Sequence, residues 1–319
     1  MKSIKRLKYL LLFVILLGVL LFSIDWIISF GARHVNVSDL GKINLIFNHR
    51  VDPDIMIFGA SDAEWGFDAP ELQRLTHRTV YNGAIDGTHY RQLACLIDEF
   101  AQYATHNRAV ILSLGPFALR ARMGVREIER YLPVIGNQNV YESLYDMDAD
   151  LAFKCRYIPF YKYTEVSSNY YRQSFEGWKT YIKSRRQGFP LDTMLGYVPD
   201  PQAWQRAPKN ATNDASNVPI DKFTYQVLAD LIRELRSKGK KVIVLVSPFH
   251  QSGVALIKNW EQIRSGMQAL GAMADYYMDF STSTLTTQKD YFRNSFHLNA
   301  NGSKVFASIL AEQLNRILK

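Results

Sequence analysis

A serine, a glycine and a histidine stand at positions where a site for acyl transfer could be assembled. Ser61 directly follows the apolar stretch "DIMIFG", in "GASDAEWGFDA". Gly59 permits a tight turn there, so the hydroxyl of Ser61 would project from the end of a strand as a nucleophile. Its backbone N–H could help to stabilise an oxyanion. Serines often follow strands, however, so this stretch alone indicates no more than a turn.

Gly87 lies in "YNGAIDGTHYRQ", where a short strand ends at Asn82 and a helix follows. A glycine N–H at the start of a helix faces the same edge of the sheet and is a suitable oxyanion donor. Taken alone, Gly87 is equally explained by the turn that it makes.

His297 lies in "NSFHLNANG", just before the last helix, and would act as the general base. Three residues upstream, Asn294 stands where an acid would orient the imidazole. An amide oxygen can accept the Nδ1–H bond but supplies no charge, and in a Ser–His–Asp enzyme the Asp-to-Asn change lowers turnover about 10⁴-fold. A Ser–His dyad is one alternative, and an approach of Asp279 or Asp290 is another. The sequence does not choose among them.

Five short apolar runs predict the strands that must position these residues: 54–59, 79–82, 109–115, 241–248 and 276–280. Helical patterns occur between and after them, at 68–76, 88–106, 221–238, 252–271 and 301–318. The strands are β-branched and bounded by Gly, Pro, Asp or Asn. Alternation of strands and helices predicts an α/β fold with a mostly parallel, five-stranded sheet that is covered on both faces.

Residues 116–220 interrupt this alternation and are interpreted as an insertion. They contain "NYYRQSFEGWKTYIKSRRQGF" and the polar tract "APKNATNDASNVP". We expect the insertion to lie over the carboxyl edge of the sheet, where open α/β folds bind ligands. Its Tyr and Trp side chains would either line a groove for sugar rings or form the insertion's own core.

The first thirty residues predict a membrane anchor. Lys2, Lys5, Arg6 and Lys8 precede "YLLLFVILLGVLLFSI", and the segment from Tyr9 to Phe30 is about long enough to cross a bilayer core of roughly 30 Å. No small-residue cleavage site follows, which favours an uncleaved signal anchor (1–30) over a cleaved signal peptide. The basic cluster places the N-terminus in the cytoplasm and residues 31–319 outside it, in the periplasm or on the outer face of a bacterial cell.

Charge and cysteine content add little about function. The formal net charge is +8, but four of these charges belong to the N-terminal cluster, so the remainder gives no argument for nucleic acid as a partner. Cys95 and Cys155 would form either one disulfide or two buried free thiols. The seven His show no metal-ligand spacing, and no metal or cofactor is expected.

The three polar stretches resemble the sequence blocks of the SGNH/GDSL hydrolase superfamily. Ser61 in "GAS" matches the nucleophile of the family's "GDS", with Ala60 in place of Asp; Gly87 matches the oxyanion glycine, and His297 the base of the final Asp-x-x-His. The resemblance covers about residues 54–115 and 241–318. It implies a flavodoxin-like, three-layer α/β/α domain.

The chain departs from that pattern at two places. In the third block, "ILSLGPFALR", Pro116 and Phe117 follow Gly115 where the family has an oxyanion asparagine. One oxyanion donor is therefore missing or comes from elsewhere. Asn294 occupies the aspartate position of the last block.

The anchor, the "GAS" block and the insertion resemble the membrane-anchored branch of the superfamily, which includes D-alanyl-transfer and alginate or peptidoglycan O-acetylation proteins. "VLVSPFHQSG" fits this branch and makes His250 a candidate pocket residue, with a turn-forming polar residue as the alternative. The resemblance implies an acyl (acetyl) transferase or esterase acting on a cell-surface polysaccharide, with an acyl donor and a membrane-bound O-acyltransferase as expected partners. The alternative is a catalytically weak or inactive protein that binds glycan or such a partner.

Overall fold

The computed structural model describes residues 2–121, 124–204 and 215–319. Most of the polar tract at 207–219 lies outside the described residues. Within the described ranges, five parallel strands form one sheet in the order β2-β1-β3-β4-β5. They are β1 (Ile55–Phe58), β2 (Val80–Asn82), β3 (Ala109–Leu114), β4 (Lys241–Val246) and β5 (Tyr276–Asp279). The prediction of an α/β fold with a parallel five-stranded sheet is confirmed.

Alternating residues of the central strands pack on opposite faces of the sheet. In β1, Met56 and Phe58 belong to one buried apolar cluster, whereas Ile55 and Ile57 belong to the other. The first cluster includes side chains of α2 (Ser38–Phe47), α5 (Tyr90–Tyr103), α9 (Lys222–Ser237) and α11 (Trp260–Gly271). The second includes side chains of α3 (Ser61–Gly66), α4 (Ala69–Thr76) and α12 (Ala300–Ile317). Because both faces are covered, the strands are apolar at nearly every position.

The predicted helix at 252–271 is wrong as a single element. The structure has a short α10 (Gln251–Val254), a break, and then α11. Ile257 lies in the break and pairs with Ser216, whose N–H donates to Leu256 O at 3.0 Å and whose oxygen accepts the Lys258 N–H at 2.9 Å. These two long-range bonds take up backbone groups that a continuous helix would use, and the Asn259 side chain adds a bond to the backbone oxygen of Val218 at 2.8 Å.

His297, expected just before the last helix, lies there on a short hairpin. β6 (Phe292–Asn294) and β7 (His297–Leu298) pair antiparallel just before α12. Three 3₁₀ turns accompany the insertion, η1 (Ile128–Arg130), η2 (Leu132–Val134) and η3 (Tyr161–Thr164), and two precede the hairpin, η4 (Thr284–Thr287) and η5 (Lys289–Tyr291).

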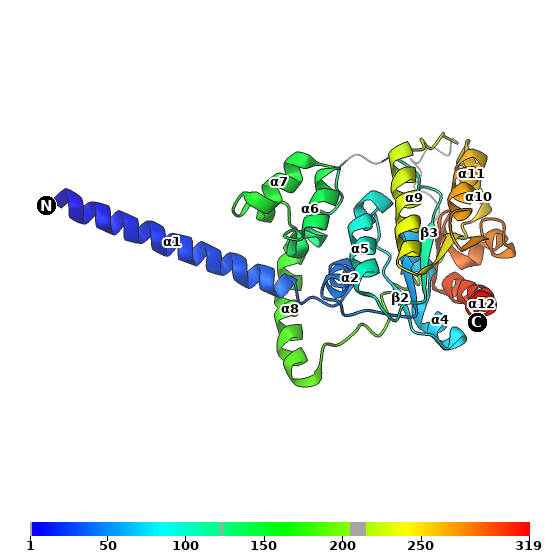
Figure 1. Cartoon of the computed structure of the whole chain (residues 1–319), viewed down its shortest axis with the longest axis horizontal. Coiled ribbons are helices and arrows are strands. Elements are labelled where there is room, and N and C mark those ends of the chain that lie inside the picture. The colour runs from blue at the N-terminus through cyan, green and yellow to red at the C-terminus, as the bar shows by residue number, and fades with distance from the viewer. Residues whose placement is uncertain (1, 122–123, 205–214) are drawn as a thin grey trace.

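The segment 116–220 does not behave as one cover over the sheet edge. Its helices α6 (Gln138–Tyr145), α7 (Ala149–Tyr157) and α8 (Ser168–Gln187) lie beside α5 and α1, on the side of the domain from which α1 leaves (Figure 1). Of its described residues, those at 116–118 line the cavity at the carboxyl ends of the strands, Arg130 bonds to Asp86 in the loop after β2, and Leu195 accepts the N–H of Asn82. Trp178, the tryptophan of α8, packs on Trp26 and Phe30 of α1, so it does not line a sugar groove near Ser61.

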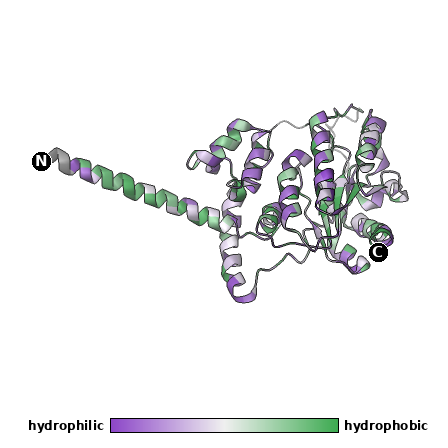
Figure 2. Cartoon of the chain, viewed as in Figure 1, coloured by the Kyte–Doolittle hydropathy of each residue, from purple (hydrophilic) through white to green (hydrophobic). Residues whose placement is uncertain are grey.

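The first helix, α1 (Lys2–Ala32), projects from the domain (Figure 1) and is hydrophobic along most of its length (Figure 2). Residues 6–32 have a mean hydropathy of 2.7 in their most apolar stretch, so by length and composition this helix could cross a membrane. Of the two alternatives for Cys95 and Cys155, the structure has two buried free thiols.

Candidate active site

The candidate site lies where the sheet reverses its strand order. β1 is flanked by β2 on one side and β3 on the other, and ligands of open α/β sheets bind outside the carboxyl ends of such strands. A cavity of about 60 Å³ occupies this place. The residues that follow β1 (Ala60, Ser61, Asp62) and β3 (Gly115 to Ala118) line it, together with Thr88, His89, Tyr90, Leu93, Ser113, Phe296 and His297.

Ser61 and His297 meet in this cavity, although 236 positions separate them in the sequence. Ser61 is the first residue of α3, immediately after β1, and its Oγ lies 2.9 Å from His297 Nε2. Both residues are partly buried. The distance allows direct proton transfer between the hydroxyl and the imidazole.

Asn294 holds the ring of His297 in the tautomer that this transfer requires. Asn294 Oδ1 accepts the backbone N–H of Phe296 at 2.9 Å and of His297 at 3.1 Å, and it lies 3.0 Å from His297 Nδ1. Backbone N–H groups can only donate, so the amide must present its oxygen to all three nitrogens. His297 Nδ1 therefore carries the proton, and Nε2 is free to accept one from Ser61.

The surroundings of His297 disfavour its charged form. The Trp65 ring lies edge-on at 4.7 Å, and Arg293 stacks on Trp65 while it pairs with Asp200 at 2.5 Å. Burial, followed by the positive charge of Arg293, lowers the pKa of His297 to about 4, although Asp200 opposes this shift. The imidazole is therefore neutral at pH 7 and ready to act as a base.

Neither of the two alternative carboxylates is hydrogen-bonded to His297, whose Nδ1 faces Asn294. Asp279 pairs with Arg264 at 2.7 Å and accepts the hydroxyl of Ser281 at 2.6 Å. Asp290 lies in η5, where its backbone oxygen accepts the Asn299 side chain. Of the candidates open at the level of sequence, Asn294 is the one bonded to His297.

Gly87 lies in a loop that is held by hydrogen bonds between the neighbouring residue Asp86 and both Glu64 and Arg130. It has a φ of +70°, which suits glycine, and it precedes the lining residues Thr88 and His89. The residue before it, Asp86, donates its N–H to Glu64 Oε2 at 3.1 Å and accepts from Arg130 Nη1 at 2.6 Å. Gly87 itself is not among the residues that line the cavity, so its proposed N–H donation is not visible in this structure.

A buried lysine completes the support of this loop. Lys42 of α2 donates to Glu64 Oε1 at 2.5 Å and to the backbone oxygen of Ala84 at 2.6 Å. Both side chains are 4% exposed. Glu64 belongs to α3, the helix that begins at Ser61, so one ion pair connects the nucleophile's helix with the loop that carries Gly87.

Asp62 forms a cluster beneath Ser61 that no sequence pattern indicated. Its Oδ2 lies 3.0 Å from Ser113 Oγ and 2.8 Å from Ser247 Oγ, and the two hydroxyls are 2.6 Å apart. Removal of the Asp62 carboxyl from water raises its pKa, and the hydrogen bonds that it accepts from Ser247 and Ser113 oppose this shift.

His250 does not line the cavity as expected, and Phe117 gives the cavity an apolar wall. His250 caps α10, with Nδ1 2.8 Å from Ser252 Oγ, and packs against Trp204; it is not among the lining residues of the cavity. In the third block, Phe117 packs on Phe296 with ring centroids 5.0 Å apart, and the two rings form an apolar wall of the cavity. At this place the side chain of Phe117 contributes an apolar ring, not a hydrogen-bond donor.

Besides Asp62, the residue that sequence reasoning missed is His89. It is 4% exposed and lines the cavity. Its position two residues after Gly87 was the available signal, but nothing in its type or spacing set it apart from the other histidines.

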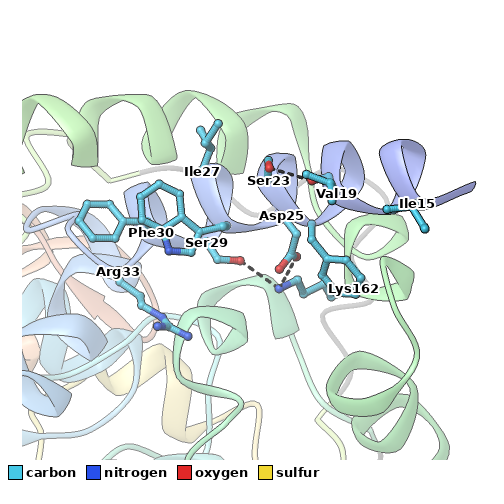
Figure 3. A pocket seen from close by; sticks show the side chains of 12 residues that line it. Ile15, Val19, Ser23, Asp25, Ile27, Ser29, Phe30, Arg33 and Lys162 are labelled. Carbon is cyan, nitrogen blue, oxygen red and sulfur yellow. Dashed lines mark hydrogen bonds and ion pairs between the residues drawn. The ribbon is translucent and has the colours of Figure 1, made fainter. Parts of the chain in front are cut away.

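Two further observations concern metal ligands and a second hollow. In the described part of the chain, no group of three or more His, Cys, Asp or Glu is placed to hold a metal ion. A hollow of about 960 Å³, much larger than the cavity at Ser61, runs along α1 and is lined by residues such as Asp25, Ser29 and Lys162 (Figure 3). It holds no nucleophile–base pair, so the chemistry is assigned to the smaller cavity.

Comparisons with known proteins give no relative on which to rest the function. No family model matches the sequence, and no curated protein matches it. The function must therefore be argued from the site itself.

Proposed function

We propose that this chain is a membrane-anchored, SGNH-like enzyme that transfers or hydrolyses an acyl ester on a cell-surface polysaccharide. The observation that carries the proposal is the hydrogen-bonded series from Ser61 through His297 to Asn294, with Ser61 Oγ 2.9 Å from Nε2 and Asn294 Oδ1 3.0 Å from Nδ1. A nucleophile, a base and an orienting group in this order are typical of acyl transfer.

In the proposed reaction, Ser61 Oγ bonds to the acyl carbon while its proton passes to His297 Nε2. The backbone N–H of Ser61 stabilises the resulting oxyanion. Gly87 is the second donor on the strength of the resemblance, and it directly precedes the lining residues Thr88 and His89. His297 then gives the proton to the departing alcohol oxygen, which leaves an acyl-serine. A water or a sugar hydroxyl attacks that ester, loses its proton to His297 and frees Ser61. The second nucleophile decides between hydrolysis and transfer.

The small size of the cavity, about 60 Å³, supports a short acyl group such as acetyl. Leu93, Phe117 and Phe296 wall it with apolar surface, which suits a methyl group better than a charged one.

The sheet order and the anchor support the remaining parts of the proposal. Strand order 2-1-3-4-5 with ligand-facing residues after β1 and β3 is that of flavodoxin-like folds, and we propose the three-layer SGNH arrangement on this basis. With α1 in the membrane, the basic residues before it favour a cytoplasmic N-terminus and a domain outside the cytoplasm. A polysaccharide or a membrane-bound acyltransferase would meet the site there.

The decisive experiment is ester turnover by the full-length protein in detergent or nanodiscs, with an aryl acetate and an acetylated glycan as substrates. Ser61→Ala and His297→Ala should each lower kcat by about 10³-fold or more. Ser237→Ala, on the exposed end of α9, is the matched control. A fluorophosphonate should label Ser61 in the wild type. Equal activity of wild type and Ser61→Ala would refute the proposal.

Asn294 favours a second candidate, a catalytically weak or inactive protein that binds an acylated glycan. Its amide orients His297 but supplies no charge to stabilise the imidazolium, and the nearest charged group on the same hairpin is Arg293, which opposes that cation. Binding of an acetylated glycan without turnover, unchanged in Ser61→Ala, would establish this alternative.

A further inference from the structure

The domain contacts α1 well before the helix ends. The ring of Phe160, just before η3, lies 6.0 Å from that of Phe22, and Lys162 in η3 pairs with Asp25 at 2.8 Å. Figure 3 shows this ion pair on the side of α1 that faces the domain. Farther along, Trp178 of α8 packs against Trp26 with ring centroids 5.8 Å apart. From Phe22 onward, one face of α1 is therefore held by the domain, while Phe22, Trp26 and Ile27 remain between 49% and 64% exposed.

Only a short part of α1 is clear of the domain. The part of α1 between the basic residue Lys8 and the first contact with the domain is residues 9–21. At 1.5 Å per residue it rises about 20 Å, whereas a bilayer core is roughly 30 Å thick. A span that is too short draws flanking parts of the protein into the interface.

The parts of the domain that flank α1 carry apolar side chains suited to that place. Six of them are between 42% and 62% exposed; we call them the apolar rim. They are Phe153, Tyr157 and Ile158 at α7, and Tyr171, Phe175 and Ile182 on α8. α7 and α8 lie on either side of the point where α1 leaves the domain (Figure 1).

The rim is continuous with the apolar surface of α1. Tyr157 and Ile158 line a hollow together with Phe22 and Asp25. On α8, Phe175 and Ile182 are three and four positions from Trp178, which itself contacts α1, so they lie on the same side of that helix. Patches of this kind mark interaction surfaces, and this one adjoins a helix built for lipid.

The charge of α8 identifies the partner. Its charged side chains are all exposed, and five are basic against one acidic: Arg172, Lys179, Lys183, Arg185, Arg186 and Glu176. α8 runs across the end of α1, as a helix lying in the plane of a membrane surface would (Figure 1). An amphipathic helix with aromatic and basic residues is typical of binding at an anionic lipid interface.

We infer that the apolar rim and α8 lie in the lipid interface on the domain side of the membrane and extend the short span of α1. The domain then rests on the bilayer, with the rim among the acyl-chain boundary and the basic residues of α8 at lipid phosphates. This inference requires α1 to cross the membrane but does not depend on the proposed acyl chemistry.

The test measures the depth of single labels in the full-length protein, reconstituted into vesicles of neutral lipid with or without an anionic lipid. A lipid-sensitive fluorophore is placed at Phe175→Cys in a background with Cys95 and Cys155 replaced by Ala, and nitroxide-labelled lipids serve as quenchers. Phe223→Cys is the matched control, because Phe223 is 50% exposed but lies on α9, away from α1. Quenching at position 175 should exceed quenching at position 223 several-fold.

A label at Gly18→Cys distinguishes insertion of α1 into the membrane from contact of the apolar rim with lipid. Gly18 has no atom near its side-chain position, and lies within the apolar span. Strong quenching there without quenching at position 175 would overturn the inference, and so would the absence of quenching at both. Lys183→Glu with Arg186→Glu should weaken quenching at position 175 in anionic vesicles several-fold but not in neutral ones. Shielding of position 175 that grows with protein density, without lipid quenching, would show a protein partner instead and would also overturn it.

Discussion

Asn294 Oδ1 lies 3.0 Å from His297 Nδ1 and is held there by two backbone N–H groups of its own turn. The amide thus performs the geometric part of a triad aspartate without its charge. The first prediction follows directly. Asn294→Asp should raise kcat of the ester reaction by about tenfold or more, because a carboxylate stabilises the imidazolium that forms in the transition state. The measurement is turnover of an acetyl ester.

The control for this prediction is Asn294→Ala, which removes the acceptor for all three N–H groups and should lower kcat. If Asn294→Asp and Asn294→Ala were equally impaired, orientation by Asn294 would not be what limits the wild type.

On the acid side, kcat/KM should begin to fall only at an unusually low pH. Because burial and Arg293 lower the pKa of His297 to about 4, the neutral imidazole persists down to that pH, and activity should fall only below it. A free imidazole would give a limb near its ordinary pKa of 6.5. Asn294→Asp adds a negative charge beside the ring, raises its pKa and should move the limb to higher pH. A limb near 6.5 in the wild type would contradict the description of the site.

The cluster of Asp62, Ser113 and Ser247 should be sensitive to charge rather than to shape. Asp62 has a raised pKa in the folded protein, so between its ordinary value of 3.8 and that raised value the unfolded chain releases the proton first. Folding stability should therefore fall as pH rises through this window. Asp62→Asn, which cannot ionise, should gain stability relative to the wild type over the same window.

Denaturant unfolding at several pH values measures this difference, and Asp279→Asn serves as the comparison. The pKa of Asp279 is lowered, chiefly by its hydrogen bonds with Ser281 and Arg264, which outweigh the opposing effect of burial. Its replacement should therefore change stability with the opposite dependence on pH. A difference between wild type and Asp62→Asn that is independent of pH would show that Asp62 is ionised throughout.

The ion pair of Lys42 and Glu64 should matter for both stability and catalysis. Lys42→Met leaves Glu64 buried without a cation and Ala84 without its donor, which should cost about 3–5 kcal/mol of unfolding free energy. The double variant Lys42→Met with Glu64→Leu should recover part of that stability. It should still lower kcat more than it raises KM, because the N–H of Asp86 has lost its acceptor and the loop before Gly87 is released. Recovery of full kcat in the double variant would show that the pair does not position this loop.

The crossing of α1 and α8 should tolerate no side chain at its closest point. A Cβ at Gly31 would overlap the backbone oxygen of Ser174, and one at Gly177 would overlap that of Gly31. Gly31→Leu should therefore destabilise the domain by about 3 kcal/mol, as overpacking of a tight interface does. Gly18→Leu, which meets open space, is the control on the same helix. Equal melting temperatures for the two variants would contradict this packing.

The regular elements were predictable because their signals are local. Apolar runs of β-branched residues predicted each strand of the sheet to within a residue or two, and Asp221 caps the helix that was predicted to begin there. The meeting of Ser61 and His297 followed from the same reasoning, since the carboxyl ends of parallel strands share an edge. The prediction of one continuous helix over 252–271 failed. Bonds with Ser216 and Val218, about forty positions away in the sequence, compete with the helix at Ile257 and Asn259.

The environment of the site was less accessible to sequence reasoning. The cluster of Asp62, Ser113 and Ser247 depends on three strand ends meeting, and nothing in the type or spacing of each residue alone indicates it. The role of Asn294 had a local signal, since an Asn that accepts from the N–H groups two and three residues later is a common turn. The place of the insertion beside α1 had none, because its contacts with Trp26 and Gly31 are set by packing across more than a hundred residues.

Because α1 is one unbroken helix from Lys2 to Ala32 and its last turns are bonded into the domain, no hinge separates the two. An enzyme on a flexible linker samples a volume around its anchor. Here the domain can only turn and tilt together with the helix, so the opening at Ser61 stands at one height and faces one direction relative to the anchor. With α1 in a bilayer, a polymer would have to be brought to that height to be modified, and the depth at which α1 settles would select which layer of the envelope the site can reach.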